Sequence, residues 1–421
     1  MLKKLPNVGD VIVGDDDERI AKLITMLGDI VEERSVSYKA INANHLTSYR
    51  ELSGQKDEPR YLVLIDGIAA FAETYQLTGR YAAIWSRFQQ VLSDGREVGV
   101  HFAVSADRPQ AIPNSIAASF QRKVVLRLTD EDAYLYFNLP RDVLSASSAP
   151  GRAMQVGNPN LLQLPILGTN VTDFAQAREI ESLAGTRYMR QRTRPAPIRS
   201  LPLDIPAREV ALTVDGRPVI GVEAGSLSPM PLRPAGTVAI TGPAQSGRTN
   251  TVRWLARSVH RAFPNAVMLH ASARRSLVAR EPLWTETAQG ADKIASMLMK
   301  HAHLFEEEAP DNTPGVVLFV EGIGEFSFSA CDQQLQDAIA SSKANGHLVV
   351  AEADVSGWSF GGSLASGVRS GRTGIVLCPS PGEGENAVGV AVPGVSGREA
   401  VPGRGYFVQS GKQWKVQVPR V

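Results

Sequence analysis

The sequence predicts an α/β protein in which two successive segments each form a mostly parallel sheet with helices on both faces. Short apolar runs of strand length alternate with stretches whose apolar residues recur at helical spacing, and this alternation occurs in both halves of the chain. The runs at 61–65 and 316–320 have the continuous apolar character of strands buried on both faces, and an acidic residue follows each of them.

Size and composition narrow the class of protein. The chain has 421 residues, enough for two to three domains of roughly 150 residues each. There are 44 Lys and Arg against 43 Asp and Glu, so the net charge favours neither nucleic acid nor a membrane surface as a partner. Cys331 and Cys378 form neither a disulfide framework nor a metal-binding pattern. Because no apolar run reaches the ~18 residues of a membrane helix, we expect a cytoplasmic protein, with the soluble part of a membrane-bound protein as the alternative.

The first segment, residues 1–186, is expected to open with a short strand at 11–13. A helix follows, because aspartates suit its N-terminus and apolar residues then recur on one face: Ile20, Leu23, Ile24, Leu27, Ile30 and Val31. Further strands are predicted at 61–65 and 100–104, with an amphipathic helix between them. Asp66 directly follows the first of these strands, where either a nucleotide- or metal-site acid or a plain strand-end cap would lie.

Residues 187–205 form a linker by composition. Arginines alternate there with prolines: Arg187, Arg190, Arg192, Arg194, Pro195, Pro197, Arg199 and Pro202. A solvated basic connector is the simpler interpretation, and a contact with an anion or nucleic acid is the alternative. The second segment, residues 206–421, then repeats the alternation, with strands expected at 237–241, 316–320 and 348–351.

The strongest chemical signal is a glycine-containing turn between the predicted strand at 237–241 and a helix. It matches a phosphate-binding loop at every position except the lysine: Gly242, Pro243, Ala244, Gln245, Ser246, Gly247, Arg248 and Thr249. Such a loop wraps phosphates in backbone amides at a helix N-terminus and binds Mg²⁺ through a hydroxyl. Arg248 keeps the positive charge of the lysine but presents a planar fork. A glycine turn that matches by chance is the alternative.

Hydrolysis also requires carboxylates at the tip of a neighbouring strand. Glu321 occupies the place of the acid that holds Mg²⁺, and Gly322 stands where the acid that orients the attacking water belongs. In the first segment Gly67 follows Asp66 in the same way, and no phosphate-binding loop precedes it. We therefore expect a site that binds ATP and Mg²⁺, the metal through Thr249 and Glu321. It should cleave ATP weakly or not at all, and no catalytic residue is assigned.

Several stretches, taken in order, resemble the FtsK/SpoIIIE family of RecA-like P-loop ATPases. They lie at 5–13, 61–66, 95–101, 108–109, 121–127, 150–152, 220–221, 242–249, 342–347, 372–374 and 402–406. Two such modules joined by a proline-rich linker are similar to EccC, the type VII secretion ATPase. The resemblance implies two tandem RecA-like modules, of which the first is N-terminally incomplete and lacks its phosphate-binding loop, as in a truncated product or a fragment.

The resemblance also implies a function and partners. The function is that of ATP-binding, regulatory or substrate-recognition modules of a type VII secretion-like translocation ATPase. The partners are an upstream ATPase module or a membrane-anchored subunit, secreted helical hairpins of the WXG100 type, and further copies of the chain in a homo-oligomer. The resemblance also places the chain at the inner face of the membrane, as part of a larger complex. The alternative is a component of an ATP-driven FtsK-type DNA translocase, which would bind duplex DNA in a salt-dependent manner.

Overall fold

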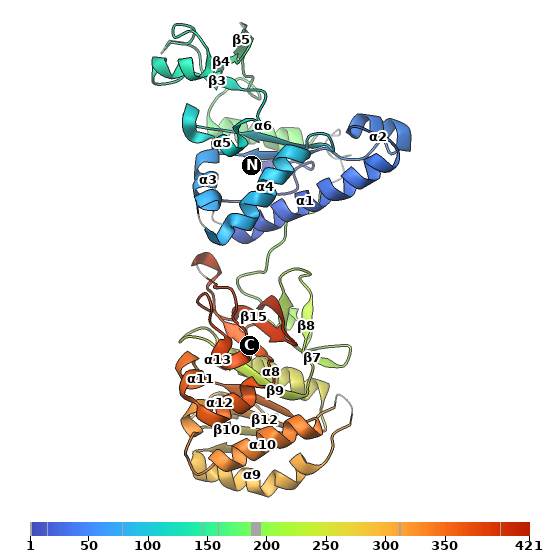
Figure 1. The fold of residues 1–421 in the computed structure, drawn as a ribbon, viewed down its shortest axis with the longest axis vertical. Helices are drawn as coiled ribbons and strands as arrows, with labels where there is room; N and C mark the ends of the chain where they lie inside the picture. The colour runs from blue at the N-terminus through green and yellow to red at the C-terminus, as the bar shows by residue number, and fades with distance from the viewer. Residues whose placement is uncertain are drawn as a thin grey trace. The chain divides into compact units, whose positions relative to one another are not determined.

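The computed structural model describes residues 2–14, 16–77, 79–145, 147–158, 160–186, 195–310, 313–395 and 397–421. The chain folds as two compact units, residues 1–199 and 200–421 (Figure 1). None of the helices in the described ranges is long and apolar enough to cross a membrane. Four arginines of the predicted linker fall outside the described ranges: Arg187, Arg190, Arg192 and Arg194.

The first unit is mainly helical, with short strands. Its elements, with 3-10 helices labelled η, are η1 (Leu2–Lys4), α1 (Asp17–Ala40), α2 (Leu46–Ser53), β1 (Tyr61–Ile65), α3 (Ile68–Leu77), η2 (Gly79–Tyr81), α4 (Ala82–Asp94), β2 (Val100–Val104), η3 (Pro109–Ala111), α5 (Asn114–Ala117), β3 (Val124–Leu126), η4 (Glu131–Phe137), β4 (Arg152–Gln155), β5 (Leu161–Gln163) and α6 (Asp173–Ala184).

Strands β1 and β2 pair in parallel, as predicted, and form a two-stranded sheet. Helices α1 and α4 pack on one face of it, where residues such as Leu27 and Val91 contact Tyr61 and Val63. The other face is bare, because Leu62 and Leu64 are 64% and 62% exposed. The prediction that this strand is buried on both faces is therefore wrong, and so is the prediction of helices on both faces of this sheet.

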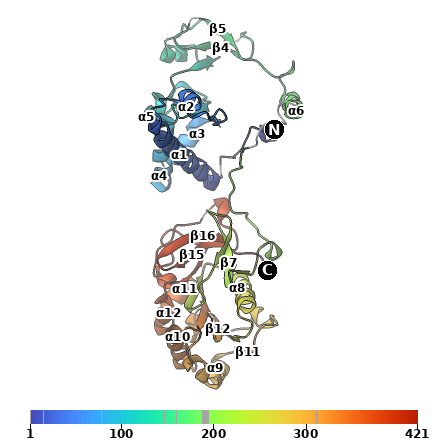
Figure 2. The ribbon, with the colours of Figure 1, turned by 90° about the vertical axis from the view of Figure 1, so that its right-hand side faces the viewer.

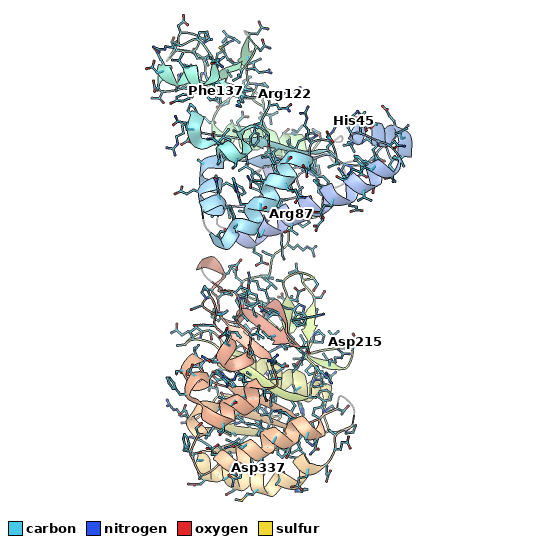
Figure 3. The ribbon with its side chains drawn as sticks, in the orientation of Figure 1. His45, Arg87, Arg122, Phe137, Asp215 and Asp337 are labelled. Atoms are coloured by element: carbon cyan, nitrogen blue, oxygen red, sulfur yellow. The ribbon has the colours of Figure 1, made fainter. Side chains whose placement is uncertain are left out.

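Ion pairs add to the apolar contact between α1 and α4. Arg87 on α4, labelled in Figure 3, reaches Asp29 on α1 with 3.1 Å between Nη2 and Oδ1, and also pairs with Glu32. The Arg87 guanidinium holds the pKa of the Glu32 carboxyl below its usual value. Asp16 caps the N-terminus of α1, as expected, by accepting a hydrogen bond from the backbone N–H of Arg19.

The expected strand at 11–13 is absent. Val11 and Val13 are 46% and 55% exposed, and no strand pairs with this stretch in the described part of the chain. Polar contacts of the preceding residue hold the segment instead. The Asp10 carboxylate pairs with Arg19 at the start of α1, and it accepts a 3.1 Å hydrogen bond from the backbone N–H of Ile198. An apolar triplet needs a neighbouring strand to become one itself.

A second, three-stranded sheet in the first unit is antiparallel, with strand order β3-β4-β5. Its small core is formed by residues that include Val125, Tyr134, Leu144 and Met154. These strands correspond to the stretches at 121–127 and 150–152. They form a sheet separate from β1 and β2.

The second unit contains one large sheet and most of the long helices. Its elements are η5 (Ala207–Glu209), β6 (Thr213–Val214), β7 (Arg217–Glu223), β8 (Pro229–Pro231), β9 (Gly236–Thr241), α8 (Arg248–Ala262), β10 (Val267–Ser272), η6 (Val278–Arg280), β11 (Glu286–Gln289), α9 (Ala291–Glu306), β12 (Val316–Glu321), η7 (Ile323–Phe326), α10 (Asp332–Asn345), β13 (Leu348–Glu352), α11 (Val355–Phe360), α12 (Gly362–Arg369), β14 (Gly374–Leu377), α13 (Glu385–Val388), η8 (Gly397–Glu399), β15 (Arg404–Gln409) and β16 (Lys412–Gln417).

The strand order of this sheet is β11-β10-β12-β13-β9-β14-β15-β16-β7-β6, with β8 also paired to β7. The strands from β11 to β14 are parallel, and β15, β16 and β7 continue the sheet in antiparallel fashion. Helix α8 covers one face, and α10 and α12 cover the other (Figure 2). The predicted parallel sheet with helices on both faces is confirmed in this unit.

The end of the predicted linker belongs to the core of the second unit. Leu201 and Ile205 are buried there, at 3% and 6% exposure. The fully buried guanidinium of Arg404 donates hydrogen bonds to the carbonyl oxygens of Leu201 and Pro202. Residues 187–205 are therefore not a solvated connector throughout, because their last part packs as core.

The two strands that end in the predicted acids allow a matched comparison. Phe319 and Leu64 each lie two residues before that acid, but Phe319 is fully buried. Phe319→Ala should lower the free energy of unfolding of its unit by about 3–5 kcal/mol, since it removes a buried ring. Leu64→Ala should change that of the first unit by less than about 0.5 kcal/mol. Hydrogen exchange on the whole chain, read on peptides from each unit, measures both values; a large loss with Leu64→Ala would contradict the exposed face.

Candidate functional site

The predicted phosphate-binding loop joins β9 to α8, as the sequence indicated. Strand β9 lies between β13 and β14, and β12 lies beyond β13. Because these strands are parallel, their carboxyl ends meet at one edge of the sheet, the usual position of ligand sites in α/β folds. The loop at 242–247 and Glu321 at the end of β12 therefore lie at the same edge.

Two glycines allow the loop to be this tight. A Cβ at Gly242 would lie 2.5 Å from the Ser246 hydroxyl oxygen and 2.8 Å from the carbonyl oxygen of Leu377. Gly247 has φ of +95°, and a Cβ there would lie 2.9 Å from the backbone nitrogen of Gly403. That nitrogen donates a 2.8 Å hydrogen bond to the Ser246 carbonyl, which fixes the loop against the segment before β15.

The loop fits the phosphates of a nucleotide. Pro243, Ala244 and Gln245 are exposed, so the turn is open to solvent, and the N-terminus of α8 adds positive potential. The Ser246 hydroxyl is buried and lacks a hydrogen-bond partner among the described residues. Thr249 is exposed on the first turn of α8, the place of the Mg²⁺-binding hydroxyl in phosphate-binding loops. The glycine cradle and this donor set are those that a triphosphate requires.

Glu321 is oriented by a buried histidine that the sequence did not reveal. His270 on β10 is fully buried, and its Nε2 lies 2.8 Å from the Glu321 Oε1. The indole of Trp284 packs on the imidazole with 5.0 Å between the ring centroids. One oxygen of Glu321 is thereby engaged, which leaves Oε2 for a water or a metal ion. No cluster of three or more acidic, His or Cys residues suited to a metal occurs in the described ranges.

Arg248, at the place of the usual lysine, pairs with Glu352 at the end of β13 through Nη1 and Oε1. The pair is partly buried, with side-chain exposures of 25% for Arg248 and 11% for Glu352. Burial raises the pKa of the Glu352 carboxyl, and the Arg248 charge opposes this rise. Sequence reasoning missed Glu352, although it directly follows the strand predicted at 348–351.

The position beside Glu321 holds no carboxylate. Gly322 has φ of +73°, a conformation that favours glycine, and its N–H donates to both the backbone carbonyl and the Oε2 of Glu352. Glu325 lies on η7 and pairs with Arg274 at the surface, with 3.2 Å between Nη2 and Oε2. Asp354 caps α11, and the bond from the Gly357 N–H lowers the pKa of its carboxyl.

Asp66 lies in the first unit, whereas the loop and Glu321 lie in the second. The Ser105 hydroxyl donates a 2.6 Å hydrogen bond to the Asp66 carboxylate and accepts one from the Gly67 N–H. These bonds give Asp66 a local role at the strand ends, and the residue is otherwise exposed. Its role at a nucleotide or metal site stays a prediction.

The chain is similar in sequence to ESX secretion system proteins. No model of a known protein family matches the chain. The ESX secretion system protein YukB of Bacillus subtilis is 24% identical over 451 residues, which cover 99% of this chain and 29% of YukB. The ESX secretion system protein EccC of Geobacillus thermodenitrificans is 24% identical over 461 residues, covering 100% of this chain and 30% of that protein. The chain thus spans about 30% of the length of these relatives.

Solved structures with the same fold include EssC (ATPases 2 and 3) from Geobacillus thermodenitrificans, with a TM-score of 0.73 and 21% identity. The structural alignment covers 82% of the EssC chain and 100% of this chain. Thermomonospora curvata EccC (ATPases 2 and 3), solved in complex with a signal sequence peptide, has a TM-score of 0.64 at 20% identity, with coverages of 80% and 100%. The tandem ATPase fold and the resemblance to EccC are therefore confirmed.

The tightness of the loop can be tested with two glycines. Gly247→Ala places a Cβ in a left-handed conformation and against Gly403, so it should lower the free energy of unfolding by about 2–3 kcal/mol. Gly411 has φ of +77° with nothing within 4 Å of its Cβ position, so Gly411→Ala should lower it by only about 1 kcal/mol. Urea denaturation of the whole chain measures both. Equal losses would show that the contact with Gly403 does not constrain the loop.

Proposed function

We propose that this chain binds ATP through the loop at 242–249 and serves as a regulatory and substrate-recognition part of a type VII secretion ATPase. The loop carries the proposal, because a tight glycine cradle, a helix N-terminus, a cation and an exposed hydroxyl all meet at the carboxyl edge of a parallel sheet. The ESX secretion relatives, which match over nearly the whole chain, support the same assignment.

Hydrolysis is expected to be weak or absent. Thr249 and Glu321 would hold Mg²⁺, which would neutralise charge on the phosphates. One oxygen of Glu321, however, is already engaged in a 2.8 Å hydrogen bond with Nε2 of His270. Gly322 offers no side chain to orient an attacking water, and its positive φ disfavours any other residue there. Binding without rapid turnover suits a module that senses nucleotide.

A pocket on the second unit supports a substrate-recognition role. It has a volume of about 410 Å³ and lies between the edge strand β11 and helix α9. Its lining includes Thr287, Asp292, Lys293, Ser296 and Met297, a mixture of polar and apolar groups suited to a peptide. The Thermomonospora curvata neighbour was solved with a signal sequence peptide, and we propose that this pocket receives a secreted helical hairpin of the WXG100 type.

The bare face of β1 supports an upstream ATPase module as a partner. In the second unit Val317 and Phe319 are covered by α8, the helix that follows the phosphate-binding loop. Counted back from the acid that ends each strand, Leu62 and Leu64 occupy the same two places, and they are exposed. A strand and an apolar helix from another segment would cover them. A membrane-anchored subunit and further copies of the chain complete the proposed complex, at the inner face of the membrane.

The DNA-translocase alternative is not favoured, because the relatives are secretion proteins and the charges of the chain nearly cancel.

Nucleotide binding is tested by calorimetric titration of the 421-residue chain with Mg-ATP. The parent should bind with a Kd on the order of micromolar, and Thr249→Ala should weaken binding about tenfold because it removes the hydroxyl beside the phosphates. Thr74→Ala, at an exposed threonine on α3 in the first unit, is the control and should change nothing. An unchanged Kd for Thr249→Ala would contradict the assigned site, and a turnover assay on the same samples separates a sensor from a motor.

Binding of a helical hairpin at the pocket between β11 and α9 can be tested by placing a large side chain in the pocket. Ser296→Arg places a long side chain on the exposed face of α9 inside the pocket, and it should weaken binding of a labelled WXG100-type helical-hairpin protein about tenfold or more. Gln333→Arg adds the same charge on an exposed position of α10 and should leave binding intact. Fluorescence anisotropy measures both. If the two variants bind like the parent, the recognition site lies elsewhere.

A further inference from the structure

We propose that the Glu352 carboxylate competes with ATP for the phosphate-loop cation Arg248. Glu352 pairs with Arg248 in the nucleotide-free protein, and ATP binds by displacing Glu352 from this pair. The inference rests on the proposed nucleotide-binding function of the loop. It adds a competitor built into the site and assigns to Glu352 a role in setting the affinity for nucleotide.

The geometry places Glu352 where it can act like a phosphate oxygen. Strand β13 lies between β9, which leads into the loop, and β12, which ends in Glu321. In the register of β12 and β13, Glu321 lies directly opposite Glu352. One oxygen of the Glu352 carboxylate contacts the Arg248 guanidinium, and the other accepts a 3.2 Å hydrogen bond from the Gly322 N–H. A cation and a backbone amide on two adjacent oxygens are also what this kind of site offers to a phosphoryl group.

Competition between Glu352 and ATP follows from the burial of the Arg248–Glu352 pair. A buried carboxylate that loses its cation is left with an uncompensated charge, which is costly. A triphosphate that attracts Arg248 must therefore meet the cost of leaving Glu352, which is mostly buried, without its cation.

Charged groups on neighbouring elements face Glu352. Arg248 on α8 faces it and favours the ionised form, as does the Gly322 N–H, whereas Glu321 on β12 disfavours it. Asp354, two residues further on, lies close enough to Arg248 to interact with its charge. Burial outweighs the favourable contacts and raises the pKa of Glu352. A ligand that draws Arg248 away therefore removes the main charge that compensates the Glu352 carboxylate.

The test is calorimetric titration of the whole chain with Mg-ATP near neutral pH. Glu352→Gln removes the charge with little change in shape, and Glu352→Met also removes the hydrogen bond to Arg248. Both should bind Mg-ATP about tenfold more tightly than the parent.

Glu281→Gln is the matched control. Glu281 is as buried as Glu352, each with 9% exposure of the whole residue, and it pairs with Arg253 and Arg257 on the same helix α8, away from the loop. Its neutralisation should leave ATP affinity unchanged, although it removes a comparable ion pair. A gain in affinity with Glu281→Gln equal to that with Glu352→Gln would overturn the specific role of Glu352.

The remaining outcomes separate this inference from the proposed function. If the parent and both Glu352 variants bind Mg-ATP with the same affinity, the internal competitor is overturned and nucleotide binding stands. If none of them binds, and Arg248→Lys does not restore binding, both proposals fail. Circular dichroism of each variant confirms that it is folded; should Glu352→Met not fold, Glu352→Gln decides the matter alone.

Discussion

The candidate site of the second unit depends on the burial of its central parallel strands from both sides. Strands β13 and β9 are almost entirely inaccessible to solvent, because α8 packs on one face of the sheet and α10 and α12 pack on the other. Burial of apolar surface is the dominant favourable contribution to folding, at roughly 25 cal/mol per Å². Burial of the apolar face of α8 against the sheet fixes the position of this helix, and the start of the helix fixes the position of the loop. The loop can therefore adopt a tight, partly strained turn, because the helix after it is held by the core.

A second set of contacts holds the loop from the C-terminal end of the chain. Gly403 donates to the Ser246 carbonyl, and Asn250 on α8 exchanges hydrogen bonds with the backbone of Pro419 and Val421. The guanidinium of Arg404, fully buried, bonds to Gln417 and to the carbonyl oxygens at 201–202. A buried arginine is costly unless its donors are satisfied, so this network requires both segments to be in place. Residues far apart in sequence thereby become parts of one support for the loop.

The sequence was a good guide where the information is local. The strands at 237–241 and 316–320 and the helix after Gly247 follow from apolar periodicity and from turn chemistry, and they form as predicted. Pairings across the sheet were not accessible in the same way. His270 lies within an apolar run, and its link to Glu321 depends on β10 and β12 being neighbours. Glu352 meets Arg248 only because β13 inserts between β12 and β9.

The errors in the first unit have the same origin. An apolar run such as 61–65 predicts a strand, but its burial depends on what lies against each face. The triplet at 11–13 likewise resembles a strand and lacks a neighbour with which to pair. Periodicity describes what a segment can bury, and the rest of the fold decides what it does bury.

The substitution of arginine for lysine is best understood together with the carboxylate it meets. A lysine ammonium is a compact, strongly hydrated charge, whereas a guanidinium is weakly hydrated and can bond several acceptors at once in a fixed plane. At a loop bordered by Glu321, Glu352 and Asp354, such a cation finds protein carboxylates within reach and does not need a ligand to be satisfied. The affinity of the loop for phosphate then depends on the difference between two interaction free energies, that of Arg248 with the phosphate and that of Arg248 with Glu352. A site of this kind can keep the full shape of a phosphate-binding loop, while a single buried carboxylate sets the range of ATP concentration over which the site fills.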